Sequence, residues 1–350
     1  MNKKVIITVV LLVIAIFGAI GVFVFFLDDQ DQSQILSKKS KDEASTTYTF
    51  PFTGLETTEE PTHRAVAVMI NNHPQARPQS GLEEADIVFE LLAEGNITRF
   101  LALYHSMEPE RVGPVRSARE YYADLANQYD ALYIYHGAAD FVDELIVNRG
   151  IPFLNGSQYD NDKQLFIRET FRIAPHNSYL LFNEVYRRAE MKQYDMEYDH
   201  EPLPFLEEDD EVTGIEAPYA KIQYYPQSST VEYEYDATRE AYIRTSDGTV
   251  TTDLGTEAPI EIDNVFIIEA THEVIDAEGR RAIDLQSGGF GYLLQRGKVQ
   301  KVQWENVNGY LLAKKNEEIV PFVPGKTWVN VIQTSPPKNV EQLYIPEYNE

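Results

Sequence analysis

Three arginines surround a Gly-Pro turn in the stretch ERVGPVRSARE, residues 110–120. They are Arg111, Arg116 and Arg119. This concentration of positive charge is unexpected, because the chain has 30 Lys+Arg against 56 Asp+Glu and a formal net charge of −26 at pH 7. Guanidinium groups form bidentate hydrogen bonds with carboxylates and phosphates. The stretch therefore predicts a site for an anion, such as a phosphate, a phosphodiester or a uronic carboxylate.

The spacing of Ser117 and Glu120 is that of a capping box, which predicts a helix that starts at Ser117 and runs to about Tyr129. Unpaired N–H groups and the helix dipole favour negative charge at a helix N-terminus. Arg116 would then lie beside that terminus.

A structural alternative stays open for the same arginines. Four nearby carboxylates, those of Glu94, Glu110, Glu120 and Asp124, are close enough in sequence to pair with them. In that case the arginines form internal salt bridges and bind no ligand.

Two further loop-to-helix junctions carry polar groups. His136 follows the apolar run 132–135, and the segment FIRETFRIAPHNS, residues 166–178, precedes a predicted helix that starts near Asn177 or Ser178. Loops that follow strands in a mixed α/β unit tend to gather at one edge, where ligands bind. We therefore expect the three junctions to converge. The predicted ligand-binding residues are Arg99, Arg111, Arg116, Ser117, Arg119, His136, Arg168, Arg172, His176 and Asn177.

The elements around these residues predict an α+β fold. Two apolar runs, 86–92 and 97–104, flank Gly95-Asn96 and read as a strand, a tight turn and a second strand. A strand at 132–136 and a helix at 138–148 follow. Residues 63–205 are thus expected to form a mixed α/β domain.

After residue 206 the pattern changes. The acidic run Glu207–Glu211 predicts a solvated loop at a domain boundary. Alternating segments at 230–236, 241–245, 265–270, 292–295 and 328–333 then predict a mainly antiparallel β domain over residues 206–350.

The N-terminus predicts a membrane anchor over residues 1–27. No residue from Val5 to Leu27 is charged, and this run is long enough for a bilayer-spanning helix. Lys3 and Lys4 precede it, so the N-terminus is expected in the cytoplasm and the following domains outside the membrane. A signal peptide cleaved near Gly21 is the alternative. The polar residues 28–62 predict a flexible linker.

Composition limits the remaining functions. The long-range field of a strongly acidic surface repels nucleic acids and anionic lipid headgroups, and no nucleic acid is expected as a partner. The chain has no cysteine, which excludes disulfides and thiolate chemistry. No motif predicts a cofactor or a metal site, and none identifies a reaction.

Four blocks of the sequence resemble the YerB family of bacterial envelope lipoproteins. They are RVGPVRSAR at 111–119, HGAADF at 136–141, RIAPHNSYL at 172–180 and PGKTWVNVI at 324–332. The resemblance covers roughly residues 60–340 and implies an extracytoplasmic, membrane-tethered, two-domain α+β protein. The resemblance implies no particular biochemical activity. The chain departs from the lipoprotein pattern because it lacks the cysteine that carries the lipid.

The sequence therefore predicts a membrane-anchored, extracytoplasmic envelope protein that binds an anionic envelope ligand or an envelope protein. Two alternatives remain. The order of the strands and the arginine-bearing loop is similar to that of the LytR–CpsA–Psr phosphotransferases, which favours a phosphotransferase or hydrolase that acts on a polyprenyl-pyrophosphate-linked precursor. The other is a purely structural protein–protein interaction module.

Overall fold

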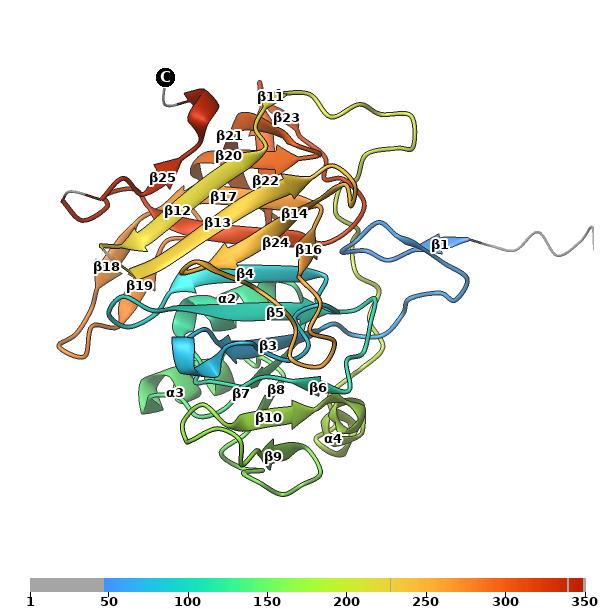
Figure 1. The fold of residues 1–350 in the computed structure, drawn as a ribbon. Coiled ribbons are helices and arrows are strands. Elements are labelled where there is room, and N and C mark those ends of the chain that lie inside the picture. Colours follow the sequence, from blue (N-terminus) through green and yellow to red (C-terminus); the bar gives the residue numbers. More distant parts are fainter. Residues whose placement is uncertain (1–46, 227, 339, 349–350) are drawn as a thin grey trace, which may run out of the picture. The chain divides into compact units, whose positions relative to one another are not determined.

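A computed structural model describes residues 47–226, 228–338 and 340–348 (Figure 1). The residues from Thr49 onward group into one compact unit, which consists mostly of strands with few helices. The predicted membrane helix at 1–27 and the predicted linker up to residue 46 lie outside the described residues. Within the described ranges, no helix is both long and apolar enough to cross a bilayer.

A central sheet of twelve strands, counted over the described residues, organises this unit. Its strands in spatial order are β23 (Glu318–Ile319), β22 (Tyr310–Lys315), β21 (Lys298–Val307), β20 (Gly289–Gln295), β17 (Asn264–Ala270), β24 (Thr327–Gln333), β4 (Ile87–Leu92), β5 (Thr98–Tyr104), β3 (Val66–Asn71), β7 (Leu132–Tyr135) and β8 (Phe153–Asn155), with β11 (Ile215–Glu216) paired to β21. The parallel pairing of β24 with β4 joins the two predicted domains. Residues 63–205 and 206–350 therefore share one sheet.

Smaller sheets and short helices complete the unit. A six-stranded sheet contains β15 (Thr249–Val250), β14 (Ala241–Ser246), β13 (Ser228–Asp236), β12 (Tyr219–Tyr225), β25 (Leu343–Tyr344) and β16 (Glu261–Ile262). A three-stranded sheet contains β6 (Arg111–Val112), β10 (Ser178–Leu181) and β9 (Phe166–Arg168), and the short strands are β1 (Tyr48–Thr49), β2 (Glu56–Thr57), β18 (His272–Val274) and β19 (Arg281–Ile283). The helices are α2 (Glu120–Gln128), α3 (Asp140–Asn148) and α4 (Val185–Met191), with 3-10 turns η1 (Pro74–Ala76), η2 (Phe182–Glu184) and η3 (Pro346–Tyr348).

Both faces of the central sheet are covered. All six residues of β3 are buried, because alternate side chains enter two different cores. Ala67 and Met69 belong to the core that includes α2, whereas Val68 and Ile70 belong to the core that includes β10 and the six-stranded sheet. The sheet is therefore the middle layer, and its strand ends are fixed from both sides.

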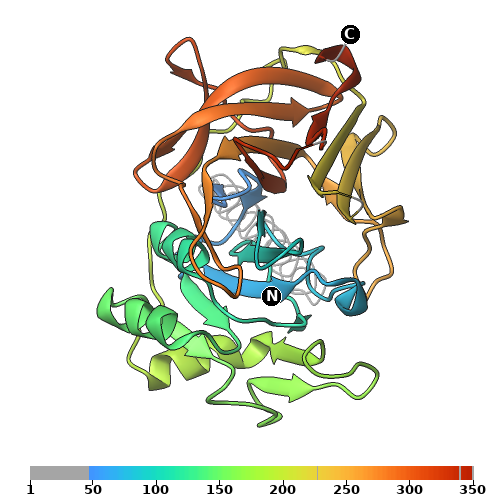
Figure 2. The ribbon, with the colours of Figure 1, turned by 90° about the vertical axis from the view of Figure 1, so that its left-hand side faces the viewer.

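The central sheet has a group of strands that point the same way and end at one edge, namely β17, β24, β4, β3, β7 and β8. The parallel pairs β17–β24, β24–β4, β3–β7 and β7–β8 establish this, together with the antiparallel strand β5 between β4 and β3. We call this the carboxyl edge; it lies on the left in Figure 1 and faces the viewer in Figure 2. The chain turns there into η1, α2 and α3.

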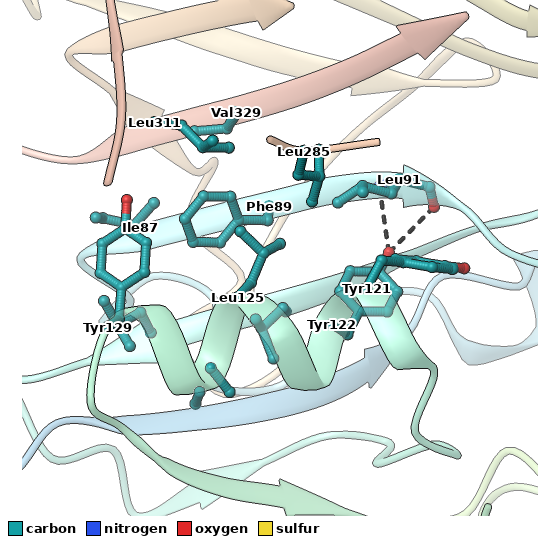
Figure 3. Close-up of a cluster of buried hydrophobic side chains, with 14 of the residues drawn as sticks. Ile87, Phe89, Leu91, Tyr121, Tyr122, Leu125, Tyr129, Leu285, Leu311 and Val329 are labelled. Carbon is teal, nitrogen blue, oxygen red and sulfur yellow. Dashed lines mark hydrogen bonds between the residues drawn. The ribbon is translucent and has the colours of Figure 1, made fainter. Parts of the chain in front are cut away.

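Two tyrosines attach the start of α2 to strand β4 (Figure 3). The Tyr122 hydroxyl donates to the Arg99 carbonyl oxygen at 2.6 Å and also accepts from the Leu91 amide, while the Tyr121 hydroxyl donates to the Leu92 carbonyl oxygen at 2.8 Å. Both rings are buried. These bonds fix the position of the arginine-bearing loop that precedes α2.

The elements expected after residue 206 are present. The segments predicted as strands correspond to β13, β14, β17, β20 and β24, and all pairings within this part of the chain are antiparallel except β17–β24. The acidic run Glu207–Glu211 is exposed, as expected of a solvated loop.

The predicted linker over 28–62 extends too far. Phe52 has no exposed surface and packs edge-on against the rings of His105 and His200, 5.6 and 5.0 Å between centroids. The Leu203 amide also donates to the Pro51 carbonyl oxygen at 2.9 Å. The sequence pattern missed this segment because the short apolar run Phe50-Pro51-Phe52 has neither helical nor strand periodicity.

Candidate anion-binding site

The arginine-bearing loop lies between two diverging strands at the carboxyl edge. The Arg116 amide donates to the Met69 carbonyl oxygen of β3, and the His136 amide after β7 donates to the Arg116 carbonyl oxygen, both at 2.9 Å. The Val115 amide donates to the Ser178 carbonyl oxygen at 2.7 Å. The loop, the end of β7 and the start of β10 are therefore in contact, and the three predicted junctions converge.

The predicted cap at Ser117 is wrong. Helix α2 begins at Glu120, and Arg119 occupies the N-cap position with extended backbone angles and no side-chain cap bond. The Ala118 amide donates to the Gly137 carbonyl oxygen, and Arg99 donates to the Ser117 carbonyl oxygen. These tertiary bonds hold residues 117–118 extended, so the helix cannot start there.

Two of the predicted arginines share one carboxylate, which compensates only part of their combined charge. Glu94 pairs with Arg99 at 2.9 Å and also with Arg119. Burial raises the pKa of the Glu94 carboxyl, but the two guanidiniums outweigh burial and hold it below its ordinary value. For Arg99 and Arg119, the structural alternative describes the contacts correctly, with Glu94 as the partner.

Arg116 differs from these neighbours. Its Nη1 donates to the Pro175 carbonyl oxygen at 3.1 Å, and no carboxylate of the described residues lies within ion-pair distance of it. Burial, followed by Arg99 and Arg119, lowers the pKa of Arg116 to about 10, an effect that Glu94 only partly offsets. The guanidinium is therefore still protonated at pH 7. Its positive charge has no partner in an ion pair among the described residues.

Two histidines lie near Arg116. The rings of His73 and His176 stack with centroids 4.5 Å apart, and the side-chain amide of Asn71 contacts Nδ1 of His176 at 2.8 Å. Burial lowers the pKa of both histidines, and Arg116 lowers both further. The sequence analysis did not predict His73 as a site residue. The available signal was its position in the polar run Asn71–His73, at the end of an apolar strand.

Arg172 has no carboxylate partner within the described part of the chain. Its Nη1 donates to the Ala76 carbonyl oxygen at 2.7 Å and to the Tyr179 hydroxyl at 2.6 Å. Arg172 contributes to the lowered pKa of His176. We call Arg116 and Arg172, together with His73 and His176 beside them, the cationic cluster; the two arginines carry its charge at pH 7.

The remaining predicted residues form a separate hydrogen-bonded group. Arg168 donates to Asp160 at 2.6 Å and to Asn177 Oδ1 at 3.0 Å, and His136 Nδ1 lies 2.8 Å from the Ser178 hydroxyl. Burial lowers the pKa of His136. Arg111 on β6 pairs with Glu169. The charges of Arg168 and Arg111 are therefore compensated by acids.

The helix predicted near Asn177 or Ser178 is wrong. Ser178–Leu181 is strand β10, which pairs with β6 on one side and β9 on the other, and α4 begins only at Val185. Pairing on both sides satisfies the backbone of β10 as a strand. His176 and Asn177 consequently lie beside a strand start and have no helix amides to cap.

The cluster combines guanidinium donors with imidazole groups at the carboxyl edge, and such groups bind phosphate or carboxylate oxygens. Within the described residues, no group of three His, Asp or Glu side chains is arranged to hold a metal ion. The geometry therefore supports recognition of an anion by hydrogen bonds and charge.

Comparison with known proteins gives consistent relatives. Residues 52–195 match the family model "Protein of unknown function (DUF3048) N-terminal domain", and residues 220–329 match the corresponding C-terminal domain model. The "Putative lipoprotein YerB" of Bacillus subtilis (strain 168) is 44% identical over 317 residues, which cover 89% of this chain and 92% of the relative. The crystal structure of YerB protein from Bacillus subtilis has a TM-score of 0.77 and 42% sequence identity, and the match covers 85% of this chain and 99% of that chain.

Proposed function

This chain belongs to the YerB-like DUF3048 family, and we propose that it is a membrane-anchored, extracytoplasmic envelope protein that binds an anionic ligand at the cationic cluster. Two features support the location. The Bacillus subtilis relative is named a putative lipoprotein, and the uncharged run Val5–Leu27 follows Lys3 and Lys4 in this sequence. The proposed anchor in this chain is the apolar run itself, since the sequence contains no cysteine to carry a lipid.

The observation that carries the proposed binding is the uncompensated charge of Arg116. In a chain with a net charge of −26, most arginines of the described residues pair with an acid, and Arg99, Arg119, Arg111 and Arg168 do so. Arg116 instead is partly buried beside Arg99 and Arg119, and burial, followed by these two cations, lowers its pKa. An anion placed there would relieve this repulsion and gain charge-assisted hydrogen bonds.

Thermal melts with and without pyrophosphate test the binding. Pyrophosphate should raise the melting temperature of the parent, and Arg116→Ala should abolish most of that rise. Losing one charge-assisted bond costs about 1.5–3 kcal/mol, or roughly tenfold or more in affinity. Without ligand, Arg116→Ala should melt at or slightly above the parent temperature, since the change removes a repelled charge.

Arg239→Ala is the matched control. Arg239 pairs with Asp236 and Glu261 on the exposed surface, so its loss should leave the pyrophosphate-induced rise unchanged. A parent protein that shows no rise, or an Arg116→Ala variant that keeps it, would refute the proposed site.

The topology is tested separately by adding protease to intact protoplasts. Digestion of the globular part is expected, and protection of the whole chain would contradict the proposed topology.

A further inference from the structure

The loop between β9 and β10, residues 169–177, carries two large apolar side chains on its outside. Phe171 is 56% exposed and Ile173 is 85% exposed, the highest value for a large apolar side chain among the described residues. Single apolar residues on a surface are common. Two of them in one loop, at positions 171 and 173 on either side of Arg172 in the sequence, form what we call the apolar tip.

Specific contacts hold this loop in place. The Arg172 guanidinium donates to the carbonyl oxygens of Ala76 and Pro78, at 2.7 and 2.5 Å. The Glu169 amide donates to the Asn177 carbonyl oxygen at 2.9 Å, and the His176 amide donates to the Ile173 carbonyl oxygen at 3.0 Å. The loop is closed at its base and anchored near its tip, so the exposure of Ile173 belongs to an ordered conformation.

The apolar tip adjoins the cationic cluster. The Pro175 carbonyl oxygen, two residues after Ile173, accepts the hydrogen bond from Arg116, and His176 of the same loop stacks on His73. The acid of this loop, Glu169, is paired with Arg111. The apolar tip and the carbonyl group that Arg116 contacts thus lie on one short segment.

We propose that loop 169–177 docks the protein onto an anionic phospholipid surface, with a lipid phosphate at Arg116 and with Phe171 and Ile173 among the acyl chains. This inference rests on the proposed function, because it identifies the anion as a lipid headgroup. A free phosphate offers the same oxygens but leaves the apolar tip in water. Interfacial apolar residues typically enter the boundary between headgroups and acyl chains by about 5–10 Å.

Because the chain has no cysteine, a single introduced cysteine can be labelled selectively, and this allows a direct test of the docking. Ile173→Cys in the full-length chain creates a single site for a nitroxide label. The labelled protein is reconstituted into bilayers with phosphatidylglycerol or with phosphatidylcholine alone, and the depth of the label is measured from its collisions with oxygen and with a water-soluble nickel complex. We expect the label to reach acyl-chain depth only in the phosphatidylglycerol bilayers.

Three further variants define the contact. Arg116→Gln should return the label to water, and Phe171→Ser should reduce its depth while leaving the pyrophosphate-induced rise in melting temperature intact. A label at Ile319→Cys is the control. Ile319 is an exposed residue of β23, the edge strand of the central sheet farthest in strand order from β8, and its label should remain in water in both bilayers.

The outcomes separate this inference from the proposed function. If the label at position 173 stays in water in phosphatidylglycerol bilayers while pyrophosphate still stabilises the protein through Arg116, the ligand is a soluble phosphate and the docking inference is wrong. Equal depth in both bilayers, or depth that survives Arg116→Gln, would also overturn it. Failure of both the label and the pyrophosphate assays would reject the anion site itself.

Discussion

Disrupting the buried ion pair between Glu90 and Arg244 should destabilise the whole unit. Glu90 lies on β4 and Arg244 on β14, so the pair connects the central sheet with the six-stranded sheet. Both side chains have no exposed surface, and their charged atoms are 2.8 Å apart. We consider Arg244→Met, Glu90→Gln and the double variant.

The contacts of the pair set the expected magnitude. Glu90 also accepts hydrogen bonds from Thr98 at 2.8 Å and from the Trp328 indole at 3.1 Å, and the Arg244 guanidinium stacks over Trp328 at 4.7 Å. Arg244→Met keeps much of the apolar volume but leaves the carboxylate buried without a counter-charge. Breaking a buried pair in this way costs about 3–5 kcal/mol, a large fraction of the 5–15 kcal/mol that stabilises a typical domain.

Urea unfolding measures this cost. With a slope of about 3 kcal/mol/M, at the upper end for urea, the midpoint should fall by roughly 1–2 M for Arg244→Met. The double variant should be less destabilised than the sum of the single variants, by about 0.5–3 kcal/mol, because removing both charges leaves neither one buried alone. The exposed pair Arg239–Asp236 is the control, for which no measurable coupling is expected.

Two results would refute this reasoning. Strictly additive single variants would show that the two charges do not depend on each other. A midpoint unchanged in Arg244→Met would show that water or a structural rearrangement solvates Glu90 at little cost.

Two other predictions follow from the same structure. Cleavage within the exposed run Glu207–Glu211 should leave two fragments that remain associated and unfold in one transition, because β24 pairs with both β17 and β4; fragments that separate by size exclusion without denaturant would contradict the shared sheet. Acidification should lower the melting temperature between about pH 6.5 and pH 4, since burial lowers the pKa of His105 to about 4 and that of His200 to about 3, so both contribute stability above the unfolded value near 6.5 that is lost as the pH falls. Burial raises the pKa of Asp86 to about 6, and its opposite contribution, present at low pH and lost as the pH rises through 6, only partly offsets the two histidines; a melting temperature that rises on acidification would contradict the assignment.

Local sequence signals predicted the turns, because the conformation of a turn depends on the types of its own residues. Gly95, with φ of 62°, lies in the turn that joins β4 to β5. Asp247 and Gly248, with φ of 50° and 78°, form the turn between β14 and β15. Backbone conformations with positive φ favour Gly, Asn and Asp, so these turns are readable from residue type alone. The resemblance to the YerB family was also carried by contiguous blocks, and it is confirmed.

Tertiary contacts decided the elements at the candidate site. Ser117 and Glu120 have the spacing of a helix start, yet bonds to Gly137 and Arg99 keep residues 117–118 extended. Ser178 begins a strand because β6 and β9 lie on either side of it. Propensity and capping contribute about 1 kcal/mol each, so several backbone bonds to distant strands outweigh them.

The sequence by itself determined which residues are cationic and where five strands of the second half lie, and it predicted that the polar junctions converge. Only the tertiary structure decided which of the arginines in the stretch 110–120 pairs with no acid of the described residues. Glu94 pairs with Arg99 and Arg119, whereas Arg116 donates to the carbonyl oxygen of Pro175, 59 residues away. Sequence distance does not specify such partners, because the sheet brings together segments that are remote along the chain, and electrostatic compensation depends on separations of a few ångströms.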